Sequence, residues 1–359
     1  MNKDLHGGNI YKFQREGKND ILDYSSNINP LGVPQKFIDI AKESFDKLVN
    51  YPDPYYIELR KKIAEFNSVN MNNIIVGNGA TEILFLYIRA LKPKKVLILA
   101  PCFAEYERAL KFVSANIEYF ELKESDNFYP NIINLKKEIE NNNYDLLLFC
   151  NPNNPTGQFI KLEDIKEIIE ICENKNTKIF IDEAFIEFIE NWKEKTVSLL
   201  KNKNVFIMRA FTKFFAIPGL RLGYGIGFDD EILKKMWEEK EPWTVNTFAN
   251  LAGLIMLDDK EYIEKSEKWI LEEKKFMYKE LSEFQYIKAY KTECNFILIK
   301  IYNTSSANLR DKMIEKNILI RDASNFKFLD YHFVRLAIKD RKSNLKMMET
   351  LAEFVEYRG

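Results

Sequence analysis

The stretch RAFTKFFAIPGLRLGY, residues 209–224, carries the most information about the fold and the chemistry of this chain. It continues the apolar run from Val205 to Met208, which predicts a short buried strand. Directly after that strand come the hydroxyl of Thr212 and the amine of Lys213. Eight positions later comes the guanidinium of Arg221, so three polar groups stand among aromatic and aliphatic neighbours.

These three groups suit one kind of ligand. Apolar surroundings disfavour the charged form of a lysine, so its pKa falls and the free amine can attack a carbonyl. A hydroxyl and an arginine beside it suit a phosphate. Pyridoxal 5′-phosphate (PLP), an aldehyde with a phosphate tail, satisfies all three. In a chain with 53 Lys and Arg residues, a surface lysine at a strand end is the alternative, and this stretch alone leaves both open.

Bulk composition bounds the class of protein. A chain of 359 residues can form two domains, or one large α/β unit with an appendage. The net charge of −1 gives no electrostatic signal for nucleic acid or an anionic membrane. With no apolar leader and no stretch of ~18 apolar residues, we expect a soluble cytoplasmic protein without a membrane span. Four widely spaced cysteines and two histidines predict neither a disulfide framework nor a metal site.

Strand and helix signals alternate through the first two thirds of the chain, which favours an α/β fold with a mostly parallel central sheet wrapped by helices. We expect strands at residues 96–100, 117–122, 145–150, 178–182 and 205–208. We expect helices at residues 34–49, 81–91, 106–114 and 162–173.

The pattern changes near residue 241 and predicts a smaller α+β domain. The expected elements are a long helical stretch at 249–284, a strand at 295–300, a helix at 306–315, strands at 318–321 and 333–338, and a helix at 344–357. We therefore divide the chain into an N-terminal segment (1–33) that packs on the small domain, a large cofactor-binding domain (34–245) and a small C-terminal domain (246–359).

Unusual polar segments follow several of the expected strands, at the edge of the sheet where open α/β folds collect ligands. They are NPNNPTG at 151–157 and DEAF at 182–185, and GNGATE at 77–82 opens a helix whose first amides suit a phosphate. Each has a plainer interpretation: a turn for the first, and a helix cap at Asp182. The GNG segment lacks the third glycine of a dinucleotide site. Gly223, Gly225 and Gly227 indicate a closely packed strand, not a nucleotide loop.

Taken together and in this order, these segments resemble the fold-type I PLP enzymes of the aspartate aminotransferase superfamily, essentially from end to end. Two branches compete, histidinol-phosphate aminotransferase and the L-threonine-O-3-phosphate decarboxylase of cobalamin biosynthesis. The segments HGG at 6–8, DYSSNINPLG at 23–32 and IRDASNF at 320–326 resemble the decarboxylase more. So does the segment at 212–221.

The resemblance implies roles around the cofactor. Lys213 would bond the PLP aldehyde and later move protons at the substrate carbon, Asp182 would pair with the pyridine nitrogen, and Asn154 would donate to the ring oxygen O3′. Phe103 would stack on the ring. The phosphate would be held by Gly79, Ala80, Thr81, Thr212 and Arg221. Tyr51 resembles a tyrosine that reaches the phosphate from the neighbouring subunit, which implies a homodimer with shared active sites.

The substrate would be a small phosphorylated amino acid. Strand alternation puts Arg335 on the face of Phe333 and Ala337, and a buried guanidinium requires an anion such as the substrate α-carboxylate. An exposed edge arginine is the alternative. Arg321 and His6 are candidates for the substrate phosphate, and Asn29 for the wall of the same pocket. Phe185 stands where many aminotransferases have a tyrosine that bonds O3′, which argues against a straightforward transaminase.

We therefore expect PLP-dependent decarboxylation of O-phospho-L-threonine to (R)-1-aminopropan-2-yl phosphate. A histidinol-phosphate aminotransferase is the main alternative. A phosphoserine decarboxylase also stays open, because one methyl group gives only ~1–3 kcal/mol of discrimination. A PLP-sensing regulator is disfavoured, because such proteins usually carry a DNA-binding module and the residues before 30 leave no room for one.

Overall fold

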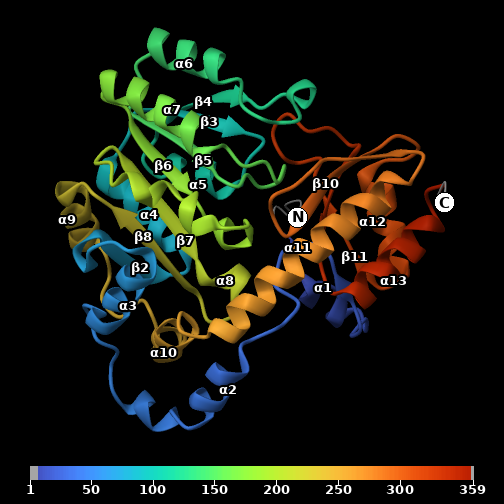
Figure 1. Cartoon of the computed structure of the whole chain (residues 1–359), viewed down its shortest axis with the longest axis horizontal. Helices are drawn as coiled ribbons and strands as arrows, with labels where there is room; N and C mark the ends of the chain where they lie inside the picture. The colour runs from blue at the N-terminus through green and yellow to red at the C-terminus, as the bar shows by residue number, and fades with distance from the viewer. Residues whose placement is uncertain (1–6, 357–359) are drawn as a thin grey trace.

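The computed structural model describes residues 7–356, and its centre is a seven-stranded sheet (Figure 1). Five neighbouring strands are parallel, and β8 is antiparallel to both of its neighbours, β7 and β2. The predicted mostly parallel α/β fold is confirmed. In sheet order the strands are β2 (Ile74–Asn78), β8 (Leu222–Gly227), β7 (Val205–Ala210), β6 (Lys178–Asp182), β5 (Leu146–Cys150), β3 (Lys95–Ala100) and β4 (Asn116–Glu121).

The central strands are apolar throughout because helices cover both faces of the sheet. Leu147 and Phe149 of β5 enter one hydrophobic core, whereas Leu146 and Leu148 enter the other. The first core is closed by α3 (Ile57–Asn67), α6 (Ile132–Asn141), α7 (Leu162–Asn174) and α10 (Thr247–Met256). The second is closed by α4 (Ala80–Leu91), α5 (Glu105–Lys111) and α9 (Asp230–Glu239).

The glycines of β8 let this strand pack closely against its surroundings, as the sequence predicts. A Cβ at Gly223 would lie 2.3 Å from the backbone nitrogen of Ala80, at the start of α4. A Cβ at Gly225 would lie 2.3 Å from the ring of Phe206. Any larger residue at these positions would push β8 away from α4 or β7.

Two expected helices are interrupted. The predicted helix at 34–49 is α2 (Gln35–Lys42) followed by a 3₁₀ turn at Phe45–Val49, whose apolar side chains are exposed and have no core to continue into. The predicted helical stretch 249–284 is α10 and then α11 (Lys260–Ser282). Asp259 separates the two, because its carboxylate accepts the N–H of Tyr262 (3.2 Å) and caps the new helix.

Helix α11 leads into a smaller antiparallel sheet in the order β12-β13-β10-β9 (Figure 1). Its strands are β12 (Arg321–Asp322), β13 (Phe333–Ala337), β10 (Phe296–Ile301) and β9 (Ile287–Ala289). Beside it lie α12 (Ser306–Glu315) and α13 (Arg341–Ala352).

The N-terminal segment, with α1 (Ile10–Arg15), joins the C-terminal part through a two-stranded sheet. Strand β1 (Leu22–Asp23) pairs in parallel with β11 (Ile318–Leu319). The single strand expected at 318–321 is therefore wrong, because its two halves belong to different sheets. The division into 1–33, 34–245 and 246–359 stays a proposal. Within residues 7–356, no helix is long and apolar enough to cross a membrane.

Candidate active site

A cavity of about 490 Å³ lies at the carboxyl ends of β5, β6 and β7 and is closed on its other side by residues of β12 and β13. Parallel strands bring their loops to this edge, so segments far apart in the sequence meet there. The cavity brings together most of the predicted site residues: Phe103, Ala80, Thr81, Asn154, Asp182, Thr212, Lys213, Arg221, Arg321 and Arg335.

Lys213 lies on a single helical turn, α8 (Phe211–Phe214), directly after β7. Its side chain is half-buried in the cavity wall. Burial, followed by the positive charges of Arg335 and Arg221, lowers the pKa of this amine to about 8. Near pH 8, a larger fraction of this amine is therefore neutral than of an exposed lysine. The neutral amine is the form that attacks an aldehyde.

Asp182 is the last residue of β6, and both of its carboxylate oxygens accept hydrogen bonds. The hydroxyl of Tyr106 donates to Oδ2 (2.6 Å), and the backbone N–H of Ala184 donates to Oδ1 (2.9 Å). Burial raises the pKa of this carboxyl to about 6, despite these two donors. A positively charged pyridine N–H would be a suitable partner for such a buried carboxylate.

A cup suited to a phosphate forms where the start of α4 meets Arg221. Gly79 has φ +79°, and a Cβ there would lie 2.4 Å from Nη2 of Arg221, so the guanidinium lies directly against the glycine. Ala80 and Thr81, the first residues of the helix, line the cavity beside Thr212. Helix N–H groups, a hydroxyl and a guanidinium together match the donors that phosphates prefer.

Two arginines stand directly opposite each other on neighbouring strands, Arg321 on β12 and Arg335 on β13. Both are buried, so the alternative of an exposed edge arginine at 335 is wrong. Arg335 donates from Nη1 to Oδ1 of Asn154 (2.5 Å), while its Nε has no hydrogen-bond partner among the described residues. Burial, followed by the charge of Arg321, lowers the pKa of the Arg335 guanidinium. Two cations this close favour an anionic ligand.

The prediction that Asn29 lines the pocket is wrong. Its amide donates to the carbonyl oxygen of Phe214 (2.8 Å) and to the hydroxyl of Ser266 (2.8 Å), so the side chain is used to hold the turn that carries Lys213. Asn27 lines the cavity instead, and its buried Oδ1 lacks a partner in the part of the chain that the structure describes. The sequence named only Asn29 as a candidate, and packing shows that Asn27 is the asparagine of this segment that lines the cavity.

Two further predicted residues lie elsewhere. His6 lies outside the described residues, so its predicted contact with the substrate phosphate stays a prediction. Tyr51 is 82% exposed and its ring packs on that of Trp243, with centroids 5.0 Å apart. It does not line the cavity of its own chain, and its predicted role concerns the neighbouring subunit.

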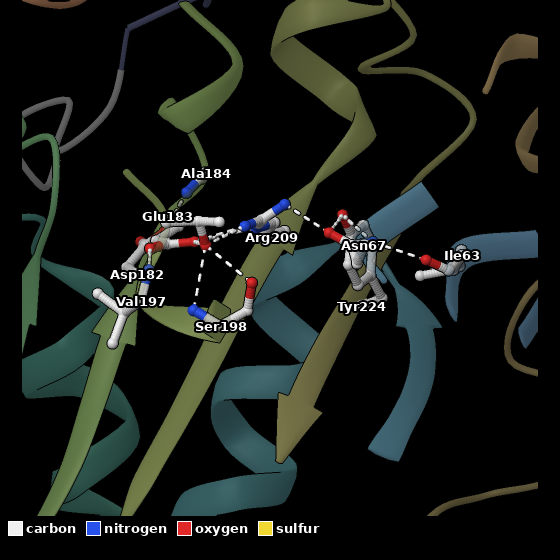
Figure 2. Close-up of polar contacts among 10 residues, drawn as sticks. Ile63, Asn67, Asp182, Glu183, Ala184, Val197, Ser198, Arg209 and Tyr224 are labelled. Carbon is white, nitrogen blue, oxygen red and sulfur yellow. Dashed lines mark hydrogen bonds and ion pairs between the residues drawn. The ribbon is translucent and has the colours of Figure 1, made fainter. Parts of the chain in front are cut away.

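Behind the cavity lies a fully buried ion pair, Glu183 with Arg209, which sequence reasoning missed (Figure 2). Arg209 donates from Nη2 and Nε to Oε2 of Glu183 (2.7 and 3.0 Å), and from Nη1 to Oδ1 of Asn67 (2.6 Å). Glu183 follows Asp182, and Arg209 precedes Lys213 by four residues. The pair therefore ties together the ends of the two strands that present the acid and the amine.

Comparisons with known proteins identify the family of this chain. The family model described as aminotransferase class I and II matches residues 19–351. The chain belongs to this family.

Among its relatives, a protein of Caldanaerobacter subterraneus subsp. tengcongensis is 43% identical over 98% of this chain and 94% of its own length. Its name marks threonine-phosphate decarboxylase as a provisional assignment. The threonine-phosphate decarboxylase of Salmonella typhimurium is 33% identical over 96% of this chain and 95% of its own. Among solved structures, the histidinol-phosphate aminotransferase of Clostridium acetobutylicum is 37% identical, with a TM-score of 0.87 over 93% of this chain and 98% of that one.

Proposed function

We propose that this member of the aminotransferase class I and II family is a PLP-dependent decarboxylase of O-phospho-L-threonine that releases (R)-1-aminopropan-2-yl phosphate. The observation that carries the proposal is one cavity with Lys213 and Asp182 on one wall and two facing arginines on the other. The near full-length similarity to proteins named threonine-phosphate decarboxylase supports the choice of substrate.

The side chains of the cavity fit PLP. Lys213 would bond the aldehyde, Asp182 would accept the ring N–H, and the cup of Gly79, Thr212 and Arg221 would hold the phosphate. Phe185 lines the cavity and has no hydroxyl to offer O3′. Asn154 uses its Oδ1 for Arg335, which leaves its Nδ2 to donate to that ring oxygen. When bound, PLP supplies an electron sink for the pair released at the substrate Cα.

The arginines would orient the substrate. Arg335 would bind the α-carboxylate, Arg321 would hold the phosphate at the other end, and Asn27 would donate to that phosphate from Nδ2. By holding the substrate at both ends, these side chains would set which bond of Cα is broken. With the bond to the carboxylate carbon selected, carbon dioxide would leave and the electron pair would remain at Cα. Lys213 would then deliver a proton to that carbon.

A histidinol-phosphate aminotransferase is the second candidate, favoured by the 37% identity and TM-score of 0.87 to the Clostridium acetobutylicum structure. The two activities use nearly the same residues and differ in the bond of Cα that is broken. Only the aminotransferase consumes 2-oxoglutarate, which makes that keto acid the discriminating reagent.

The test is to incubate the PLP-loaded protein with phosphothreonine, phosphoserine or histidinol phosphate, with and without 2-oxoglutarate. We expect carbon dioxide and the amine phosphate from phosphothreonine, at a rate that 2-oxoglutarate does not change. Glutamate formation from histidinol phosphate, without carbon dioxide from phosphothreonine, would overturn the proposal in favour of the aminotransferase.

A homodimer and a cytoplasmic location are further parts of the proposal. A hollow on the surface is lined by apolar residues of 48–52 and 243–248, among them the exposed Val49, Tyr51 and Trp243. Exposed apolar side chains gathered in one place favour a protein partner. A second copy of the chain, with its Tyr51 reaching the phosphate cup of the first, would cover this surface.

A further inference from the structure

Tyr106 lines the cavity beside Asp182, and its phenol makes the shorter of the two hydrogen bonds to that carboxylate within the described protein. Tyr106 belongs to the first turn of α5, is fully buried and donates to Oδ2 over 2.6 Å. The same ring meets Phe103 edge to face, with centroids 5.7 Å apart and planes at 83°. One side chain thus supports both the acid and the aromatic residue predicted to flank the cofactor ring.

We propose that Tyr106 is a positioning residue, which holds Asp182 ionised and correctly turned to meet the pyridine nitrogen of the cofactor. The inference rests on the proposed function, since it assumes that Asp182 pairs with the pyridine nitrogen of PLP. The backbone N–H of Ala184 fixes Oδ1, so Tyr106 supplies the second of two donors that hold the plane of the carboxylate.

The surroundings of Asp182 explain why a donor is needed. Burial and the neighbouring charge of Glu183 both favour the protonated carboxyl. Cys150 is buried beside it and stays a neutral thiol, because burial raises its pKa. Lys213 is the cation that faces Asp182 from the cavity side. Without the phenol, only the N–H of Ala184 and the charge of Lys213 would oppose burial, and the pKa of the carboxyl would rise further.

Tyr106 itself stays a donor at every working pH. Burial, followed by the charge of Asp182, raises the pKa of its phenol well above the ordinary value. The proton therefore remains on the phenol oxygen, and the hydrogen bond always favours the ionised carboxylate.

The test compares Tyr106→Phe with a matched control, Tyr290→Phe. Tyr290 is also buried, and its hydroxyl donates to Oε1 of Glu124 over the same 2.6 Å, away from the cavity. Both changes remove one phenol-to-carboxylate hydrogen bond and keep the ring. Any effect of lost stability alone would therefore be seen in both variants, and thermal unfolding of each measures it.

The first measurement is a ¹³C NMR titration of the Asp182 carboxyl in the cofactor-free protein, assigned with Asp182→Asn. We expect Tyr106→Phe to raise the pKa of Asp182 by about one unit, and Tyr290→Phe to leave it unchanged. This measurement does not depend on the cofactor. An unchanged pKa in Tyr106→Phe would overturn the inference.

The second measurement is the affinity for 4′-deoxypyridoxine 5′-phosphate, which keeps the ring nitrogen and phosphate but cannot bond Lys213. We expect the affinity of Tyr106→Phe to fall about threefold relative to wild type at pH 6.5, and less at pH 8, where Asp182 is largely ionised in both. Equal losses in Tyr106→Phe and Tyr290→Phe would also overturn the inference. Failure of the wild type to bind the probe would instead overturn the proposed cofactor.

Discussion

The chemistry depends on single side chains whose charge is set by their surroundings, and Lys213 is the clearest case. Its type and position were predictable from the stretch 209–224, because a lysine among aromatic residues after an apolar strand is unusual. Of the two arginines that lower its pKa, Arg221 belongs to the same stretch, but Arg335 comes from β13, more than 100 residues further along the chain, so the size of the effect required the structure. The same holds for Tyr106, which no sequence pattern connects with Asp182.

The pH dependence of cofactor attachment follows from this pKa. Only the neutral amine attacks the aldehyde, so the rate of PLP attachment to the cofactor-free protein should rise with pH with a midpoint at about 8. In Arg335→Met a nearby positive charge is lost, the pKa of Lys213 rises, and the rise in rate should move to higher pH. Stopped-flow absorbance measures both profiles. A midpoint near that of a free lysine in the wild type would contradict this explanation.

A second prediction at this scale contrasts substitutions of Asn27 and Asn29. Asn29→Ala should lower the melting temperature by several degrees, because it removes two buried hydrogen bonds, each worth about 1 kcal/mol. Asn27→Ala should change the melting temperature little and raise the KM for phosphothreonine about tenfold. Calorimetry and steady-state kinetics on both variants check the contrast. The reverse pattern would place Asn29, and not Asn27, at the substrate.

At the scale of elements, the apolar runs and the polar motifs that follow them were sufficient to predict where the central strands lie along the chain. The ends of helices were harder to predict. The residues on both sides of Asp259 have helical periodicity, and only the hydrogen bond from the N–H of Tyr262 to the carboxylate of Asp259 marks where α11 begins. β2 was also missed, since its residues Gly77 and Asn78 look like a loop when its partner β8 is not known. Packing between distant segments, absent from local patterns, decides such cases.

The ion pair of Glu183 with Arg209 joins β6 to β7, and its loss should weaken both the fold and the site. Glu183→Gln leaves the buried Arg209 charge without its partner, which should reduce the free energy of unfolding by about 3–5 kcal/mol. The double variant Glu183→Gln with Arg209→Met should recover part of this loss. Denaturant unfolding measures both. Equal stability of the single variant and the wild type would show that the pair does not hold these strands together.

At the scale of the whole molecule, the cavity lies between the larger and smaller sheets, and the surface around Tyr51 is left for a partner. Val49→Glu should place a charge in the proposed dimer interface and shift the protein towards monomer in analytical ultracentrifugation. PLP affinity should fall with it, because Tyr51 of the second subunit would no longer reach the phosphate. A wild-type monomer that binds PLP fully would contradict shared active sites.

The central claim is that Lys213 bonds the PLP aldehyde. Borohydride reduction of the PLP-loaded protein, followed by mass spectrometry of its peptides, tests this most directly. We predict that reduction fixes the cofactor to the peptide that contains Lys213 and that Lys213→Ala abolishes the labelling. Labelling at another lysine, or none in a protein that binds PLP, would contradict the account.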